Sequence, residues 1–299
     1  MNHIISVPID KSLAEFIGKK SSENGITFYN RKAPDGSAIT ILVPTNPSEK
    51  FYSVAESILV SDQILLSTKN IDKEFGEVLI ASSLSEKHVI ITRENDISTL
   101  LTGNILKDFE IANREEVLER IISYTQGKNI SKKRVDIDKA FPVKGIGTVV
   151  LGVVTEGTIL QHDKLFHSSG KEIEIKSIQS QDIDLKEAGE GARVGLGLKG
   201  IEHDEIEKGR ILSSKKPVQI QKFIAKLNKS SFAKEDISSQ KFYLIVMNFS
   251  HSNARVHEKD GLYEISLEKM LPVFEGDKFF LIRNSPPRIF ASGAVEALL

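Results

Sequence analysis

The stretch that decides the fold runs from Asp136 to Leu212. It begins DIDKAFPVKGIGTVVLGVVTEGTI (136–159) and ends AGEGARVGLGLKGIEHDEIEKGRIL (188–212). The run GTVVLGVV (147–154) is rich in β-branched residues and has glycines where strands bend or approach closely. Between the two ends, KEIEIKSI (171–178) alternates isoleucine with charged residues, as a half-buried strand does. Short strands with turn residues between them predict a closed antiparallel barrel without free edges.

The composition is that of an ordinary globular protein of two or three domains. The chain has 299 residues, of which 40% are hydrophobic and 27% are charged. Its net charge of −1 creates no overall attraction to nucleic acid, so RNA binding must depend on local basic patches. The absence of cysteine excludes disulfides, thiolate metal sites and thiol nucleophiles. With no apolar run of about 20 residues and no signal-peptide pattern, we expect a cytoplasmic protein without a membrane partner.

Strand and helix patterns alternate in the first part of the chain. Apolar strands are expected at 3–9, 26–30, 38–43, 63–67, 88–92 and 106–111, with a loop at 21–24 and helices at 13–19, 48–61, 74–84 and 114–125. This order predicts a doubly wound α/β domain over residues 1–127. A polar linker follows, and the hinge SSKKP (213–217) separates two all-β domains at 134–214 and 217–299.

Several of these stretches resemble one known family. IDKAFPVKGIGTVVLG (137–152), V-x-E-G-T-I (154–159) and I-E-K-G-R-I-L (206–212) resemble domain two of the translational GTPases. That family includes elongation factor Tu, its archaeal and eukaryotic counterpart, and the selenocysteine-specific elongation factor. The end of the chain, LPVFEGDKFFLIRNSPPRIFASGAVEALL (271–299), resembles the closing strands of domain three. The resemblance implies a GTPase-like domain in front of two β-barrels, with tRNA or the ribosome as partner.

The front domain departs from the family at its phosphate loop. The pattern G-x-x-x-x-G-K-S/T lets several backbone amides converge on phosphate. Here only Lys11-Ser12 matches the final pair, the glycines are absent, and the turn is too short to wrap a triphosphate. The first switch region is reduced to residues 20–25.

The second switch and the base-reading motif also depart from the family pattern. Where the family carries Asp-x-Pro-Gly-His, this chain has Pro44, Pro47 and Ser48 at the Asp, Gly and His positions. Proline cannot donate a backbone hydrogen bond. Where the family carries Asn/Thr-Lys-x-Asp, Arg93 replaces the lysine and Asp96 comes one residue late. The resemblance therefore implies a degenerate GTPase-like domain that is not an enzyme and holds no cofactor or metal.

Four residues are candidates for binding RNA. In the resembling factors, one face of domain two receives the aminoacylated end of tRNA. Asp138, Lys139, Lys144 and Arg193 match positions on that face. Arg193 equally fits a structural role at the edge of the barrel. The basic run Lys128, Lys132, Lys133 and Arg134 is either a solvated linker or a contact to phosphate.

Three functions are compatible with these observations. The first is a non-hydrolysing relative of translation elongation factors that binds tRNA or the ribosome through its barrels. The second is a regulatory module without RNA binding, whose front domain docks a protein partner. The third is a GTP-binding factor with an unorthodox site, which requires phosphate contacts that the sequence does not supply. No DNA partner is expected.

Overall fold

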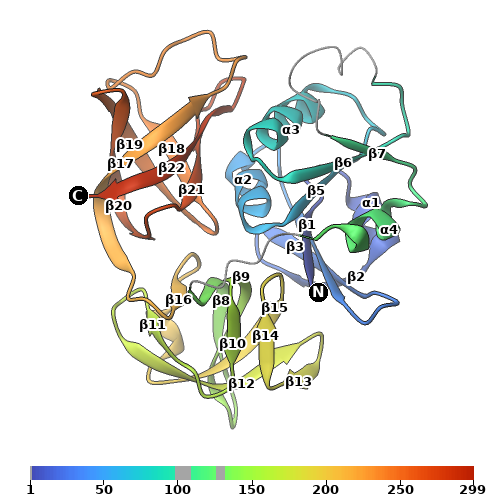
Figure 1. Ribbon diagram of the computed structural model, residues 1–299, viewed down its shortest axis with the longest axis vertical. Coiled ribbons are helices and arrows are strands. Elements are labelled where there is room, and N and C mark those ends of the chain that lie inside the picture. Colours follow the sequence, from blue (N-terminus) through green and yellow to red (C-terminus); the bar gives the residue numbers. More distant parts are fainter. Residues whose placement is uncertain (1, 98–108, 126–131) are drawn as a thin grey trace.

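The computed structural model describes residues 2–97, 109–125 and 132–299 and contains three bodies. Figure 1 shows an α/β body beside one β-barrel, with a second barrel below both. We call them the front domain (β1 to α4), the middle barrel (β8 to β16) and the last barrel (β17 to β22). An α/β sheet followed by two six-stranded barrels confirms the predicted fold class. The described residues include no helix long and apolar enough to cross a membrane.

The front domain is built on a seven-stranded sheet of order β2-β3-β4-β1-β5-β6-β7. Strands β4, β1, β5, β6 and β7 run parallel, whereas β2, β3 and β4 pair antiparallel. The strands are β1 (His3–Ser6), β2 (Lys19–Glu23), β3 (Ile26–Lys32), β4 (Ala38–Pro44), β5 (Gln63–Leu66), β6 (His88–Thr92) and β7 (Glu110–Ala112). The helices are α1 (Lys11–Ile17), α2 (Phe51–Val60), α3 (Lys73–Leu84) and α4 (Val117–Ser123).

Helices cover both faces of this sheet, which confirms the doubly wound prediction. Side chains of successive residues in a strand point to opposite faces. Leu65 therefore packs with α1 and α4, while its neighbours Ile64 and Leu66 pack with α2 and α3. The apolar runs of β5 and β6 are continuous because both of their faces are buried.

One local prediction is wrong. Residues 21–24 were expected to form a loop, but most of them belong to β2, which pairs antiparallel with β3 at the edge of the sheet. The sequence KKSSE contains no apolar alternation because the strand is almost fully exposed. Only its backbone pairing defines it. The strand expected at 106–111 lies partly outside the described residues, and its described end overlaps β7.

The middle barrel closes as the sequence predicted. Its sheet order is β11-β16-β8-β9-β15-β12-β13, and pairing of β11 with β12 closes six of these strands into a ring. The strands are β8 (Arg134–Val143), β9 (Gly147–Glu156), β11 (Lys164–His167), β12 (Glu172–Ser180), β13 (Ile183–Leu185), β15 (Arg193–Lys199) and β16 (Ile211–Ser213), with a separate pair of β10 (Thr158–Leu160) and β14 (Glu187–Gly189). Ile173, Ile175 and Ile178 point into its core, as their alternation indicated.

The last barrel is closed by six strands in the order β17-β20-β19-β18-β21-β22. They are β17 (Val218–Lys229), β18 (Tyr243–Met247), β19 (Ser250–Lys259), β20 (Leu262–Val273), β21 (Lys278–Ile282) and β22 (Ile289–Leu298). The domain limits given above stay predictions.

The front domain and the last barrel share one hydrophobic core. Phe51, Val54 and Ile58 of α2 belong to the same buried cluster as Phe280 and Ile282 of β21. These two parts are therefore joined by a packed interior rather than by a polar surface contact, and we expect them to unfold together.

Phe280→Ala tests this coupling. Phe280 is 1% exposed, and truncating it leaves a cavity at the interface, so we expect a loss of about 3–5 kcal/mol of unfolding free energy. Urea unfolding followed by circular dichroism should show one transition at a lower midpoint. Phe242→Ala is the matched control, because Phe242 is 56% exposed, and its effect should stay within about 0.5 kcal/mol. An unchanged midpoint for Phe280→Ala would show that the interface does not stabilise the fold.

Candidate nucleotide and nucleic-acid sites

The carboxyl ends of β1, β5 and β6 meet at one edge of the front sheet, where open α/β sheets bind their ligands. Polar side chains of the chain itself form hydrogen bonds here with other side chains and with the backbone. They are Asp10 after β1, Ser67 and Thr68 after β5, Thr92 and Glu94 at and after the end of β6, and Arg114 after β7. We call this group the edge cluster.

Asp10 closes the start of α1. Its carboxylate accepts hydrogen bonds from the Leu13 amide (3.1 Å) and the Ser12 hydroxyl (2.7 Å), so it is an N-cap of the helix. Burial alone would raise the pKa of Asp10, but the hydrogen bonds that its carboxylate accepts, among them those from Ser12 and the Leu13 amide, outweigh this and lower it. A negative charge of the protein therefore lies where a phosphate loop would present amides to an anion.

Lys11 and Ser12 occupy the first turn of α1, as expected from the Lys-Ser pair. The Lys11 ammonium points along the helix to Glu15, at 3.3 Å, and both side chains are more than half exposed. The Ser12 hydroxyl donates a hydrogen bond to the Asp10 carboxylate. Neither group is directed at an anion site formed by the backbone.

Glu94 is the centre of the base-reading segment. Its carboxylate accepts hydrogen bonds from Ser67 (2.7 Å) and Thr92 (2.6 Å) and pairs with Arg114 at 3.3 Å. Arg114 also donates to the Ser12 carbonyl at 3.1 Å, so it links this segment to α1. Arg93 and Asp96 lie beside Glu94 with exposed side chains. Sequence comparison with the family motif did not reveal Glu94, because its role depends on contacts across three strands.

The segment 44–48, which matches the second switch, is held by the last barrel. Pro44 ends β4 in register with Ile26. The carbonyls of Pro47 and Ser48 accept hydrogen bonds from Arg288, at 3.4 and 3.0 Å, and the Ser48 hydroxyl donates to Glu74. The Arg288 guanidinium also lies 3.9 Å from the centre of the Phe51 ring. These contacts fix the segment between two bodies.

The four RNA candidates fall into two pairs. Lys139 on β8 and Lys144 in the turn after it are exposed, and in the described part of the chain neither forms an ion pair. Arg193 is only 8% exposed and Asp138 is 1% exposed. The structure therefore brings Asp138 and Arg193 together inside the molecule and leaves the two lysines on its surface.

Arg193 joins the middle barrel to the front domain. Its Nη2 lies 2.8 Å from Oδ2 of Asp138, and its guanidinium lies 3.7 Å from the centre of the Phe28 ring on β3. Burial lowers the pKa of Arg193 and Asp138 raises it, but a guanidinium stays protonated in proteins. This placement favours the structural alternative for Arg193 over direct contact with RNA.

The described part of the basic run is paired rather than solvated. Lys132 pairs with Glu156 at 3.2 Å, and Lys133 pairs with Asp163 at 2.7 Å. Arg134, at the start of β8, is buried between Asp136 (3.0 Å) and Asp277 (2.5 Å). Lys128 lies outside the described residues. The described cations of this run are therefore not free to bind phosphate.

Comparisons with known proteins agree with this architecture. A family model for elongation factor Tu domain 2 matches residues 147–213. An uncharacterized protein of Methanocaldococcus jannaschii is 30% identical over 280 residues, 90% of this chain and 91% of that protein. The selenocysteine-specific elongation factor of the same organism is 30% identical over 178 residues, 52% of this chain but only 38% of the factor.

Solved structures match nearly the whole chain. Translation elongation factor SelB from Methanococcus maripaludis, in complex with a GTP analogue, superposes with a TM-score of 0.84 at 20% identity, over 100% of this chain and 79% of that one. A bacterial selenocysteine-specific elongation factor gives 0.83 at 17% identity, over 98% of this chain and 58% of that one. The chain thus has the fold of these elongation factors. The chain belongs to the translational GTPase family, as a relative of SelB and elongation factor Tu.

Arg193→Ala tests the junction between the middle barrel and the front domain. The substitution leaves the Asp138 carboxylate buried without its cation, so we expect a loss of about 3–5 kcal/mol of unfolding free energy. The paired change Arg193→Met with Asp138→Asn removes both charges and should cost less. Lys139→Ala is the exposed control. Urea unfolding measures all three, and an Arg193→Ala effect as small as that of Lys139→Ala would contradict the structural role.

Proposed function

We propose that this protein is a non-hydrolysing relative of the translation elongation factors that binds tRNA or the ribosome through its barrels. The front domain then serves as a scaffold. One observation carries the proposal: the fold matches SelB over the whole chain, while carboxylates of the chain itself lie at the edge of the front sheet where a nucleotide would bind.

The edge cluster is chemically unsuited to GTP. Phosphoryl transfer depends on positioned donors and a metal ion that neutralise the charge on the phosphates. Asp10 and Glu94 add negative charge instead, and the hydroxyls of Ser12, Ser67 and Thr92 already donate to them. Hydrolysis would need groups that this edge does not offer.

The hairpin of β8 and β9 offers an RNA surface. Lys139 and Lys144 are exposed, and the Lys139 ammonium lies 5.9 Å from the centre of the Phe141 ring. Ile146, at the tip, is 39% exposed, and its carbonyl accepts a hydrogen bond from the exposed Lys176. Cations beside aromatic and apolar side chains suit contact with phosphates and unstacked bases.

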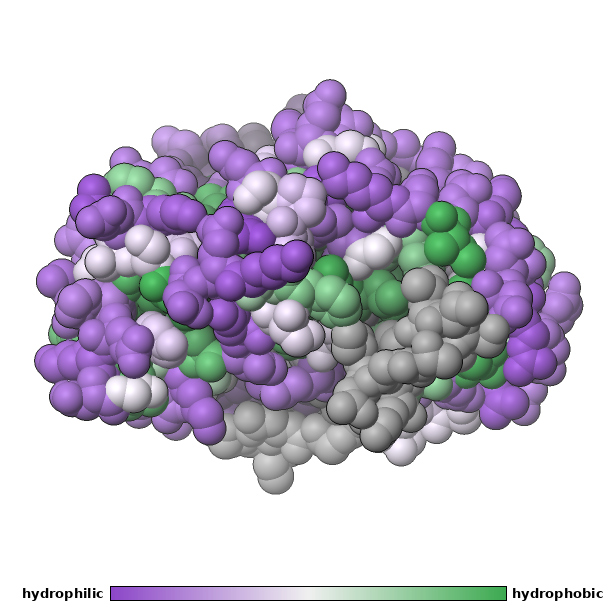
Figure 2. Space-filling view, turned by 90° about the horizontal axis from the view of Figure 1, so that it is seen from above, coloured by the Kyte–Doolittle hydropathy of each residue, from purple (hydrophilic) through white to green (hydrophobic). Residues whose placement is uncertain are grey.

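The surface at one end of the front domain and the last barrel gives less support to a protein-docking function. Figure 2 shows that the described residues on this face are mostly hydrophilic, with hydrophobic residues in small separate groups. Docking surfaces for proteins are more often large contiguous apolar patches.

Titration with a fluorescent guanine nucleotide and magnesium tests the first half of the proposal. We expect no saturable binding at micromolar concentrations, because the carboxylates of the edge cluster repel phosphate. An intact translational GTPase run in parallel is the positive control. Micromolar affinity for the nucleotide would support the GTP-binding alternative and contradict this half of the proposal.

Titration with labelled tRNA and with ribosomal subunits at several salt concentrations tests the second half. The double substitution Lys139→Glu and Lys144→Glu should weaken binding at least about tenfold. It should also flatten the salt dependence, because each lost phosphate contact removes about 0.7–0.9 from the slope of log K against log salt. Lys73→Glu on α3 is the control. It makes the same charge reversal at one residue of the front domain, and it should have little effect on RNA affinity. No binding of the wild type to either RNA would contradict the proposal and leave the regulatory module as the better explanation.

A further inference from the structure

A pocket of about 170 Å³ lies where the three bodies meet. Asp62 and Lys87 line it from the front domain, Glu156 and Gly191 from the middle barrel, and Asn248 and Asp277 from the last barrel. We call it the central pocket. It lies on the opposite end of the front strands from the edge cluster, because Asp62 precedes β5 and Lys87 precedes β6.

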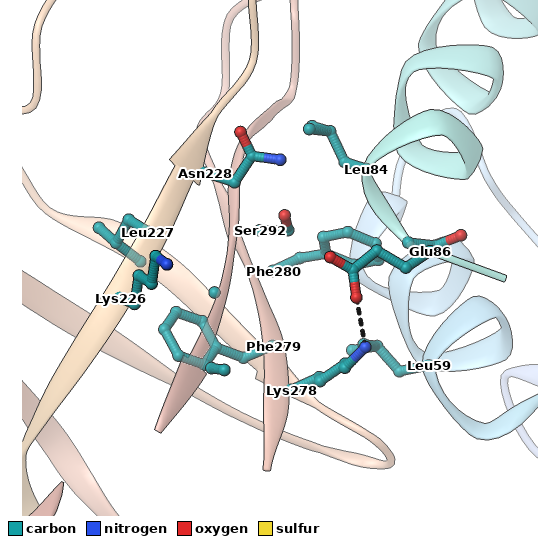
Figure 3. Close-up of a pocket in the computed structure, with 13 residues that line it drawn as sticks. Leu59, Leu84, Glu86, Lys226, Leu227, Asn228, Lys278, Phe279, Phe280 and Ser292 are labelled. Carbon is teal, nitrogen blue, oxygen red and sulfur yellow. Dashed lines mark hydrogen bonds and ion pairs between the residues drawn. The ribbon is translucent and has the colours of Figure 1, made fainter. Parts of the chain in front are cut away.

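Most charged groups on its walls already have partners. Arg134 pairs with Asp277 at 2.5 Å, which joins the two barrels, and Glu156 pairs with Lys132 at 3.2 Å. Lys278 pairs with Glu86 at 2.5 Å at the edge of a second, more apolar pocket of about 190 Å³ between the front domain and the last barrel (Figure 3). These pairs fix the walls of the central pocket.

Three polar groups in the central pocket lack such partners. Within the described part of the chain, the Lys87 ammonium and the Asn248 side-chain amide make no hydrogen bond or ion pair. Asp62 uses only Oδ2, which accepts the Ile4 amide at 3.0 Å. Burial lowers the pKa of Lys87 and raises that of Asp62, and the attraction between these two charges offsets only part of each effect. All three side chains are half-buried and face the pocket, so they are available to bind water or a ligand.

The backbone holds these groups in place. Gly191 has a φ of +81°, and a Cβ at this position would lie 2.6 Å from the Asn2 carbonyl oxygen and 3.2 Å from Oδ2 of Asp62. The turn of the middle barrel thus packs directly against Asp62. Asn248, between β18 and β19, also has a positive φ, of 46°. Close packing against the front domain therefore fixes the Gly191 turn at the wall of the pocket.

We propose that the central pocket binds a small zwitterion of the amino-acid type, whose carboxylate pairs with Lys87 and whose ammonium pairs with Asp62. A simple anion would meet the carboxylates of the walls, and a simple cation would meet Lys87. A molecule with both charges complements both groups. An engineered cavity of about 150 Å³ holds benzene, so this volume suits a ligand of roughly six to eight non-hydrogen atoms, such as alanine or serine.

Isothermal titration with alanine, serine and β-alanine tests this assignment on the full chain. Acetate and methylammonium, which each carry one of the two charges, serve as ligand controls. We expect saturable binding of at least one of the three zwitterions and no binding of acetate or methylammonium. Lys87→Met and Asp62→Asn should each weaken binding by roughly tenfold or more, because each removes one of the two charged partners of the ligand. Lys226→Met, at the second pocket, should leave the affinity unchanged.

A second measurement uses the wild-type protein and does not depend on the folding of variants. The bound zwitterion should protect Lys87 from an amine-directed acylating reagent, while Lys226 stays reactive, as read by mass spectrometry. The absence of saturable binding, or binding that survives Lys87→Met without protection of Lys87, would overturn the proposal and assign the central pocket to ordered water.

Discussion

The relative placement of the three bodies depends on one buried carboxylate, that of Glu56 on α2. The side chain is fully buried. Its Oε2 lies 2.6 Å from the ammonium of Lys208, which belongs to the middle barrel. Its Oε1 lies 3.4 Å from Nδ1 of His251 on β19 of the last barrel. A buried charge is costly unless it is paired, so the burial of Glu56 depends on Lys208 of the docked middle barrel, with His251 of the last barrel beside the second oxygen.

Other cations repeat this arrangement at the remaining junctions. Arg288 extends from the last barrel to the carbonyls at 47 and 48, Arg134 joins the two barrels through Asp277, and Arg193 pairs with Asp138 and lies over the Phe28 ring. Each guanidinium contacts a body other than its own, so at least one of its partners lies far away in the sequence. Together with the apolar core shared by α2 and β21, these contacts make one cooperative structure from three parts.

The sequence could predict what depends on local pattern. Alternation in 171–178 and the β-branched run at 147–154 gave the middle barrel, and continuous apolar runs gave the buried parallel strands. It could not predict the exposed edge strand β2, because its polar residues do not alternate with apolar ones. It also could not predict that Arg134 and Arg193 are buried. A surface arginine and a buried one have the same local sequence, and only the distant partner distinguishes them. For the same reason, the sequence showed only that the motif residues of a nucleotide site are absent from this edge. It did not reveal that Glu94 forms the contacts that hold the edge cluster together.

This distinction bears on what the front domain does under the proposed function. A ligand can shift a conformational equilibrium only by its difference in affinity for the two states. In a GTPase the nucleotide provides that difference through contacts to its phosphates and metal ion. Here the corresponding edge is filled by hydrogen bonds among side chains of the chain itself, and segment 44–48 is bound by Arg288. The placement of the barrels would then be set by interdomain contacts alone, as a constant property of the fold. A surface such as the β8–β9 hairpin would be presented continuously, and its binding would be controlled by the concentration of its partner.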